Sequence, residues 1–366
     1  MKIKTVKLKN FRNFNDFYAE FSDDINIFIG KNGQGKTNII ESFYVLSVCR
    51  SFRTHITQQL IKFDEDFSKI NASIIANNHD LNLEMILSGP NKKAKVNGTD
   101  VNRTSDFVGY LNVVAFTPDD LNLIKGSPSQ RRRFIDLELS KISPIYLFNL
   151  SKYNRLLKER NKFLKMLKEK GKSDDLYLEV LDEQMAKLQE EMIKKRIFFI
   201  EELEKYASII YSKIANNDEI ISLIYKSYVA GNENLYEKIL NKYKKNRQRD
   251  IKFMTTQDGI HKDDLKILLN GHEAIHYGSQ GQLRTIVLSI KIALLELIKK
   301  EIGEYPVLLL DDVLSELDEK RKSMLLSLLD ERIQTFITTT SLEDIDEGIL
   351  KKAKIFMIEN GELKED

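Results

Sequence analysis

The sequence has little cysteine, proline and glycine, and no tryptophan. Its 366 residues include one cysteine, Cys49, with five prolines and 16 glycines. A single cysteine excludes a disulfide framework and a cysteine-rich structural zinc site, and it is consistent with a reducing compartment. Glycine and proline together reach about half of their usual share, which leaves little material for flexible linkers or turn-rich all-β folds. A helix-rich or mixed α/β protein is expected.

Long hydrophobic runs are also missing. A membrane-spanning helix needs about 18 apolar residues in a row. The nearest candidate, 286–298, is interrupted by Lys291 and Glu296. Lysines break up the apolar stretches of the first nine residues, which excludes a signal peptide. A cytoplasmic protein with no membrane partner is the simplest expectation.

The chain has no overall excess of charge. Its formal net charge of +2 indicates no field strong enough to announce a nucleic-acid partner. The charge is unevenly distributed, however: residues 301–366 carry 8 basic and 17 acidic side chains, and the first 300 residues carry a net +11. The neutral total therefore conceals an acidic segment and a larger basic region that could meet phosphate.

The first third of the chain is patterned as sheet, with one helix that begins near Thr37. Between about 65 and 117, apolar and polar residues alternate, with turn signals at Gly89-Pro90 and Asn97-Gly98. We predict an antiparallel sheet there. Earlier strands are predicted at 3–8, 17–21 and 25–29.

The middle of the chain, from about 127 to 217, is rich in Lys, Glu and Leu with helical periodicity and a break at 171–175. It is predicted to form a hairpin of two helices of about 26 and 40 residues. At 1.5 Å per residue these arms span some 40–60 Å, far less than a long coiled coil. Later elements are predicted as strands at 220–229, 307–310, 335–339 and 355–358, helices at 238–252, 279–300 and 320–329, and a hairpin turn at Asn270-Gly271.

The segment Gly30-Lys-Asn-Gly-Gln-Gly-Lys36-Thr37 matches the phosphate-binding pattern G-x-x-x-x-G-K-[ST] between a predicted strand and a predicted helix. Its glycines let backbone N–H groups converge on phosphate oxygens, and the helix N-terminus adds its positive dipole end. Lys36 would neutralise phosphate charge and Thr37 could ligate Mg²⁺. The flanking strand and helix disfavour the alternative of a chance glycine-rich turn.

The apolar run 307–310 ends in Asp311 and Asp312. A buried parallel strand delivers carboxylates in this way at its carboxyl end, where ligands bind. Asp311 is predicted to hold Mg²⁺ through water, and Asp312 to polarise the attacking water. Alone, the run would be read as a strand that ends in a polar turn, but the phosphate loop favours the metal role.

A third segment, Ser279-Gln-Gly-Gln282, begins the predicted apolar helix at 279–300. Ser279 and Gln282 have the spacing of a capping box, which by itself would explain them. Gly281, however, costs a helix about 1 kcal/mol relative to Ala and suits the close approach of a phosphate. This second anion site lies 243 residues from Lys36, and a two-fold dimer could close two composite sites between chains.

In this order, the phosphate loop, the Ser-x-Gly-Gln segment and the Asp-Asp strand with Ser315-Glu-Leu-Asp318 resemble the ABC-type ATPase heads of the SMC class. Four segments are similar to motifs of the RecF family of bacterial recombination mediators: 279–285, 310–312 with 315–318, 126–133 and 259–264. The resemblance extends from about residue 8 to residue 341. It departs from the family at Ile260 and Lys262, where the family has Pro and Arg.

The resemblance implies an α/β fold in two parts. Residues 1–125 and 300–366 would form an ABC-type P-loop ATPase head with a mixed sheet and flanking helices, and 126–299 a mostly helical lobe with a short antiparallel arm and the signature segment. It implies ATP and Mg²⁺ as cofactors, an ATP-dependent homodimer, and gapped, single-stranded or double-stranded DNA as partner. It also implies a role in DNA repair, recombination and replication beside RecR and RecO, promoting the loading of RecA.

Hydrolysis is expected to be weak. Most ABC heads have Glu where Asp312 stands and a His after the next strand, where this chain has 338–341, Thr-Thr-Thr-Ser. Slow turnover suits a switch better than a motor. The resemblance also implies a nucleotide contact for Arg12, for which a surface arginine is the alternative. The candidate nucleotide-binding residues are Arg12, Gly30, Lys31, Asn32, Gly33, Gln34, Gly35, Lys36, Thr37, Asn38, Ser279, Gly281 and Gln282; the candidate catalytic residues are Lys36, Asp311 and Asp312; the candidate metal ligands are Thr37 and Asp311.

Two basic clusters are candidates for DNA contact. Arginines 131–133 follow the capping box Ser127-Pro-Ser-Gln130, where cations oppose the helix dipole and require a DNA phosphate or an intrachain carboxylate. Residues 238–252 hold seven basic side chains against Asp250 alone, with Tyr243 among them, so they either follow a DNA backbone or form a solvated helix. The candidate DNA-binding residues are Arg131, Arg132, Arg133, Lys244, Lys245 and Arg247.

Other functions are less well supported. An OLD-type ATPase–nuclease needs a nuclease domain after the ATPase, and only 48 residues follow Asp318. The ATPase subunit of a membrane transporter would have the His that this chain lacks at 338–341. It would also have far fewer residues between the phosphate loop and the signature segment. An SMC-like ATPase with another DNA-processing role remains a further alternative. His261 is predicted to be a hydrogen-bonded structural histidine rather than a metal ligand, and Cys49 to be buried and inert.

Overall fold

The computed structural model describes all residues except 171–174, 216–218, 230, 232, 328–331, 344 and 365–366. The chain folds into two compact units. Unit 1 comprises Met1–Asp120, Lys213–Asn216 and Val287–Asp366, and unit 2 comprises Leu121–Ser212 and Asn217–Ile286. The two functional lobes expected from the sequence, 1–125 with 300–366 and 126–299, stay a prediction.

Unit 1 contains an antiparallel six-stranded sheet in the order β2-β1-β4-β5-β6-β7. The predicted turn at Asn97-Gly98 is confirmed, because Val96 pairs with Thr99 and both turn residues have positive φ. Asn-Gly suits such a turn since both residues adopt that conformation at little cost. The strands are β1 (Lys2–Phe11), β2 (Phe14–Glu20), β4 (Phe67–Ala76), β5 (His79–Ser88), β6 (Asn91–Val96) and β7 (Thr99–Val101).

A second six-stranded sheet of unit 1 runs β15-β14-β3-β13-β12-β8 and is parallel except for β15. The expected antiparallel stretch 65–117 is wrong at its end, because Val113–Phe116 pairs in parallel with β12. All four residues of this strand are buried, which is typical of a parallel strand covered on both faces. The strands are β3 (Ile25–Ile29), β8 (Val113–Phe116), β12 (Val307–Asp311), β13 (Thr335–Thr339), β14 (Ala353–Glu359) and β15 (Glu362–Lys364).

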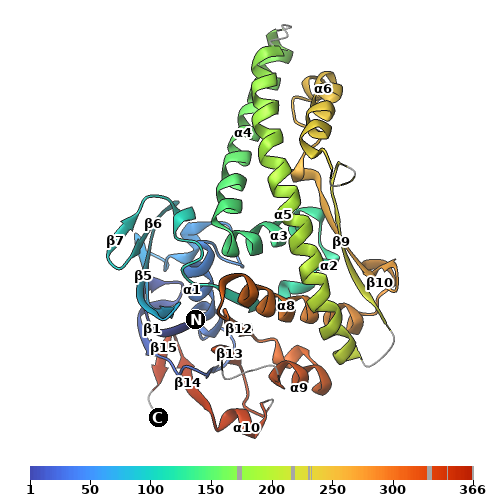
Figure 1. Ribbon diagram of the computed structural model, residues 1–366. Helices are drawn as coiled ribbons and strands as arrows, with labels where there is room; N and C mark the ends of the chain where they lie inside the picture. Colours follow the sequence, from blue (N-terminus) through green and yellow to red (C-terminus); the bar gives the residue numbers. More distant parts are fainter. Residues whose placement is uncertain are drawn as a thin grey trace. The chain divides into compact units, whose positions relative to one another are not determined.

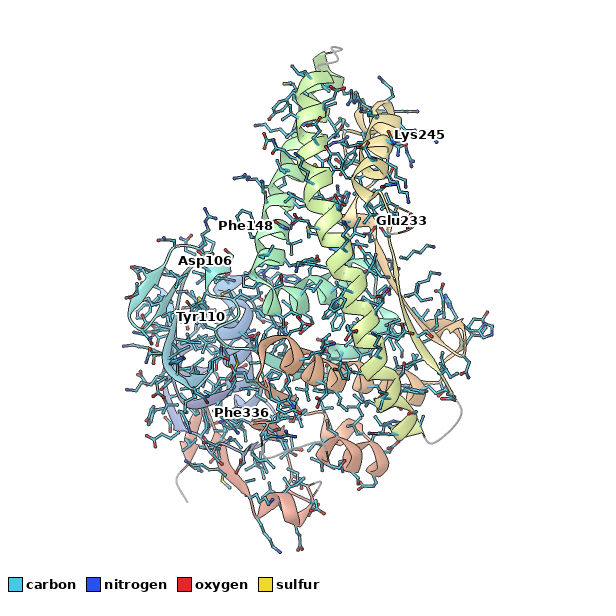
Figure 2. The ribbon with its side chains drawn as sticks, viewed as in Figure 1. Asp106, Tyr110, Phe148, Glu233, Lys245 and Phe336 are labelled. Atoms are coloured by element: carbon cyan, nitrogen blue, oxygen red, sulfur yellow. The ribbon has the colours of Figure 1, made fainter. Side chains whose placement is uncertain are left out.

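The core of unit 1 contains side chains of both sheets and of helix α1 (Lys36–Val48). Four apolar residues of this helix, at positions 39, 40, 43 and 46, are completely buried. Phe21 contacts four other phenylalanine rings edge-on, among them Phe336, labelled in Figure 2. The other helices are α9 (Glu319–Ser327), α10 (Glu347–Leu350), the part of α8 (Gln280–Ile302) from residue 287 on, and short 3-10 helices η1 (Thr57–Leu60), η2 (Thr104–Asp106), η3 (Pro118–Leu121, whose last residue belongs to unit 2) and η5 (Leu314–Glu316).

Unit 2 is mostly helical. Helices α4 and α5 lie side by side with α6 along them (Figure 1). Helices α4 and α5 contain 27 and 41 residues, which confirms the lengths expected for the two helices of the hairpin. Most of the predicted break at 171–175 lies outside the described residues. A further break separates α3 from α4 at Ser143, since the residue before a proline is disfavoured in a helix. The helices are α2 (Asn122–Lys125), α3 (Pro128–Ile142), α4 (Pro144–Lys170), α5 (Asp175–Ala215), α6 (Leu235–Phe253), α7 (Ala274–Tyr277) and η4 (Ile260–Lys262).

A three-stranded antiparallel sheet completes unit 2, in the order β11-β10-β9. Its hairpin turns at Asn270-Gly271, as the sequence predicts. The strands are β9 (Ile221–Lys226), β10 (Asp264–Leu269) and β11 (His272–Glu273). Throughout the described part of the chain, no helix is long and apolar enough to cross a membrane.

Two arginines are buried among the helices of unit 2. Arg160 is 0% exposed and donates to Asp182 and Asp250 at 2.7 Å each. Arg196 is 1% exposed and donates to Asp136 at 2.6 Å and to the Tyr146 hydroxyl at 2.7 Å. A buried guanidinium is tolerated when carboxylates and hydrogen bonds replace its water, and both arginines make such contacts. Among the described residues, Arg160 Nη2 is nevertheless buried without a hydrogen-bond partner. Sequence reasoning did not single out these pairs.

Candidate nucleotide-binding site

The segment Gly30–Thr37 connects β3 to α1, as the sequence predicts. Gly35 has a φ of 114°, and a Cβ there would lie 2.8 Å from the Asn13 side chain. A Cβ on Gly30 would lie 2.3 Å from the carbonyl oxygen of Ile358. Both positions therefore require glycine. Lys31, Asn32 and Gly33 are exposed at the turn of the loop.

Lys36 lies beneath this loop and is 4% exposed. Its Nζ donates to the carbonyl oxygens of Gly30 at 2.6 Å and Lys31 at 3.1 Å. Burial lowers the pKa of Lys36, while the nearby Asp312 and Asp311 act in the opposite direction. The backbone N–H groups of Lys36 and Thr37 have no acceptor among the described residues. An ammonium and free helix N–H groups form a cradle for phosphate oxygens.

Three oxygen-bearing side chains meet where α1 begins and β12 and β13 end. The Thr37 hydroxyl donates to Asp311 Oδ1 at 2.8 Å, and Thr338 Oγ1 donates to the same oxygen at 3.0 Å. Thr338 is the register neighbour of Asp311 across the parallel pair, and its hydroxyl also accepts the N–H of Asp312 at 2.9 Å. Burial raises the pKa of Asp311, which is 4% exposed. Hydroxyl and carboxylate oxygens are the hard ligands that Mg²⁺ prefers, so the donor set fits this ion.

The turn between β14 and β15 holds the phosphate loop from the side. The N–H of Gly361 donates to the backbone carbonyl oxygen of Gln34 at 3.1 Å, and the N–H of Asn360 donates to the Gln34 side-chain oxygen. The Asn13 amide donates to the same Gln34 carbonyl at 3.1 Å. Asn38 donates in turn to Asn13 at 2.7 Å. The loop is therefore anchored by contacts that the sequence pattern did not reveal.

Arg12 pairs with a buried carboxylate on α1. Its Nε and Nη2 donate to the two oxygens of Glu41 at 2.8 and 2.6 Å, and its Nη1 donates to the Gln59 carbonyl at 2.8 Å. Arg53 lies 3.6 Å from Glu41 and donates to Asn38 at 2.7 Å. Sequence reasoning missed Glu41, although a carboxylate on the buried face of an apolar helix is a signal. The pairing holds Arg12 near the loop without showing a nucleotide contact.

A cleft of about 670 Å³ adjoins the phosphate loop. Asn38, in the first turn of α1, lines it together with the Phe63 ring, which is 88% exposed. Its lining is Arg12, Asn13, Asn38, Arg53, Gln58, Gln59, Ile61, Lys62, Phe63 and Asp64.

The signature segment belongs to unit 2. The N–H of Ser279 donates to Gln282 Oε1 at 2.7 Å, and the N–H of Gln282 donates to Ser279 Oγ at 3.2 Å. This is the predicted capping box. Gln282 also donates to Glu219 at 2.6 Å, and Ser279 is exposed. The anion-binding role of Ser279, Gly281 and Gln282 stays a prediction.

The basic cluster at the start of α3 is fastened to the segment 259–264. Arg131 donates to the two oxygens of Asp264 at 2.7 and 3.0 Å, and to the carbonyl of Gly126 at 2.8 Å. Arg132 donates to the carbonyl oxygen of Asp263 at 2.7 Å. The intrachain alternative raised for this cluster is thus realised at Arg131. DNA contact by Arg131, Arg132 and Arg133 stays a prediction.

In the second cluster, Arg247 lies 3.6 Å from Glu179 and 3.5 Å from Asp182. Tyr243 is 1% exposed and lies under Arg160, so its ring faces the interior rather than a surface. Lys244 and Lys245 are exposed on α6, where Figure 2 labels Lys245. Three further basic side chains of the cluster, those of Lys238, Arg249 and Lys252, are exposed on the same helix.

His261 and Cys49 have structural surroundings. His261 Nδ1 lies 2.7 Å from the Tyr153 hydroxyl and Nε2 lies 3.1 Å from the Thr256 carbonyl. Burial lowers the pKa of His261 to about 4. No group of three His, Cys, Asp or Glu side chains that could hold a metal occurs among the described residues. Cys49 is buried, as predicted, and burial raises the pKa of its thiol to about 12.

Comparison with known proteins identifies the family. A relative in Staphylococcus carnosus, a DNA replication and repair protein RecF, is 45% identical over 99% of this chain and 100% of its own length. The relative of the same name in a Geobacillus species is 42% identical over 99% of this chain and 98% of its own length. This chain belongs to the RecF family. The family model for the RecF/RecN/SMC N terminal domain also matches it over residues 2–364.

The solved structures agree with this RecF assignment. The recombination mediator protein RecF with ATP, from the RecFOR pathway, is 37% identical and has a TM-score of 0.91 over 99% of this chain and 97% of its own. An SMC head bound to a winged-helix domain of ScpA has a TM-score of 0.57 at 16% identity, which shows the fold alone. The expected ABC-type head fold and the resemblance to the RecF family are confirmed. The chain is a RecF-family DNA replication and repair protein, not an OLD-type nuclease or a transporter subunit.

Proposed function

We propose that this chain is an ATP-dependent DNA-binding protein that dimerises around ATP, clamps DNA at single-strand gaps and helps to load RecA. The observation that carries the proposal is the contact between Thr37 and Asp311 at 2.8 Å, directly beside Lys36. It brings the phosphate loop and the carboxylate proposed to hold Mg²⁺, from opposite ends of the chain, into one site. The solved relative with ATP supports the same ligand for this chain.

Lys36 and the first-turn N–H groups of α1 would bind the β- and γ-phosphates. Thr37 and Asp311 would hold Mg²⁺, which supplies neutralisation of phosphate charge when bound. Asp312 would orient the attacking water through a side chain one methylene shorter than Glu. Thr338 holds the backbone of Asp312 but has no imidazole with which to contact a γ-phosphate. The site therefore supports weak hydrolysis, and the protein would act as a switch.

The nucleoside would occupy the cleft of about 670 Å³ next to the loop. Asn38 joins this cleft to the first turn of α1, so a nucleotide with its phosphates on the loop can extend into it. The exposed ring of Phe63 offers a stacking surface. Arg53 and Asn38 offer polar contacts at the same wall.

The signature segment would serve a nucleotide held by a second copy. Each chain has one phosphate loop and one Ser279-Gln-Gly-Gln282 segment, so a two-fold dimer completes two sites at once. ATP would join the copies, and loss of the γ-phosphate would release them. The exposed hydroxyl of Ser279 at the start of a 23-residue helix supports this role.

DNA is the proposed macromolecular ligand, with RecR and RecO as protein partners, and the site of action would be the cytoplasm, where the chromosome is. The RecFOR pathway named for the solved relative supports these partners. Lys244 and Lys245 are the proposed backbone contacts because they are exposed on a basic helix. Arg131, Arg132 and Arg247 have intrachain partners and are weaker candidates.

A binding titration tests the proposal. Gapped, duplex and single-stranded DNA are titrated with the full chain in ATP, in ADP and without nucleotide, at two salt concentrations. The tightest binding is expected to gapped DNA with ATP, and its salt dependence counts phosphate contacts. Equal affinity in all three nucleotide states would refute the switch.

A further inference from the structure

Unit 1 has a second pocket, of about 210 Å³, which no part of the nucleotide site uses. It lies between the segment 50–60 and strand β6. None of the residues that line it is acidic, and three carry basic side chains. The lining residues are Arg50, Ser51, Thr54, His55, Ile56, Thr57, Leu60 and Lys92.

Two cations of this pocket have no carboxylate partner. Arg50 is exposed and forms no hydrogen bond or ion pair with the described residues. Lys92 Nζ donates to the carbonyl oxygen of Cys49 at 2.7 Å and forms no ion pair with any residue that the structure describes. Burial lowers the pKa of Lys92, because a half-buried ammonium lacks some of its water. An anion would restore favourable electrostatics to both groups.

The polar wall of the pocket is held in place. Ser51 is 2% exposed, and its hydroxyl accepts the N–H groups of Arg53 at 2.8 Å and Thr54 at 3.1 Å. That hydroxyl donates to Glu41, whose two oxygens also accept from Arg12. The nearby carboxylate is therefore already engaged and cannot neutralise Arg50 and Lys92.

We propose that this pocket binds one phosphate group, and that the phosphate belongs to the backbone of DNA. Its volume accommodates a phosphate, and the guanidinium of Arg50 is suited to bind two oxygens of one phosphate. The inference rests on the proposed DNA-binding function, to which it adds a contact on unit 1. Gln59 connects this pocket to the nucleotide side, since its amide accepts from Thr54 and its carbonyl from Arg12.

The test compares two double variants of the full chain with ATP, each losing two positive charges. Arg50→Gln/Lys92→Gln empties the pocket of its cations, and Lys93→Gln/Lys95→Gln removes neighbouring lysines of β6 that pair with Asp100. Loss of one phosphate contact lowers the slope of log affinity against log salt by about 0.9. Between 50 and 200 mM salt, the wild type should lose about 3.5-fold more affinity for gapped DNA than the pocket variant. The control variant should retain the wild-type slope.

A second titration separates DNA from a free phosphate compound as the source of the phosphate. Pyrophosphate is titrated into wild type and pocket variant with the phosphate loop filled by ADP. A changed DNA slope supports the backbone contact, and pyrophosphate binding lost in the variant without a changed slope supports a phosphate site for small anions. If neither readout differs, the pocket does not bind phosphate. The single variant Arg50→Gln, at an exposed side chain, keeps the test valid if the double variant does not fold.

The two proposals can fail separately. Wild-type binding that does not depend on ATP would count against the proposed function. ATP-dependent wild-type binding with an unchanged slope and unchanged pyrophosphate binding in the pocket variant would overturn only the phosphate pocket.

Discussion

Replacing Arg131 tests whether the basic cluster on α3 binds DNA or holds unit 2 together. Arg131 binds both oxygens of Asp264, and the two side chains are 14% and 25% exposed. We predict that Arg131→Met weakens the fold and leaves DNA binding by other residues unchanged. If Arg131 instead contacts a DNA phosphate, Arg131→Met should weaken DNA binding and leave the stability of the free protein unchanged, because that contact exists only in the complex.

The magnitude follows from the geometry. Hydrogen bonds to charged groups contribute about 1.5–3 kcal/mol each when buried, and solvent at these partly exposed groups reduces the total. Arg131→Met should therefore lower the free energy of unfolding by about 2 kcal/mol. Arg131→Lys keeps the charge but cannot bind two oxygens, so it should lose about 1 kcal/mol. In a cycle with Asp264→Asn, the coupling free energy should be about 1–2 kcal/mol.

Urea unfolding followed by circular dichroism at the helix band measures the stability of the four cycle members, and salt titrations measure DNA binding. The slope of log affinity against log salt should be unchanged in Arg131→Met. A coupling below about 0.5 kcal/mol, together with a slope that falls by about one, would show that Arg131 contacts DNA and that the reasoning is wrong.

Three further predictions concern the nucleotide site, the signature segment and the partly buried His261. Lys36→Arg should bind ATP but hydrolyse very little of it, since the longer side chain cannot occupy the place of the Lys36 ammonium; hydrolysis at the wild-type rate would contradict this. Ser279→Arg should bind ATP as a monomer, and an ATP-induced dimer in light scattering would count against the composite site. His261 has a folded pKa of about 4, below the unfolded value of about 6.5, so its stabilising effect is complete above pH 6.5 and is lost as the pH falls toward 4. The stability advantage of wild type over His261→Gln should shrink by up to about 3 kcal/mol between pH 7 and 4, and a constant difference in urea unfolding would refute it.

Features that depend on neighbours in sequence could be predicted. The loop from Gly30 to Thr37 is specified by glycines between a strand and a helix, and the turn at Asn97-Gly98 by residues that tolerate positive φ. The arm lengths and the capping box at Ser279 follow from periodicity and spacing in the same way. The antiparallel pairing predicted for the strand at 113–116 was wrong, because its pairing partner β12 lies almost 200 residues away in the sequence.

Outside the motifs, only the tertiary structure decided which polar groups meet. The motifs predict that Thr37 and Asp311, 274 positions apart, share one Mg²⁺ site, but no motif pairs Arg131 with Asp264, 133 positions away. A basic residue has the same sequence signature whether it meets a phosphate or a carboxylate of its own chain, and both alternatives were open for Arg131. The choice depends on which backbone segments the burial of apolar surface brings together, and on the cost of leaving a charge unpaired there. The sequence by itself therefore determined that the protein has a phosphate loop and two basic clusters. The fold decided that Arg131 is engaged within the chain, while Arg50 has no partner among the described residues.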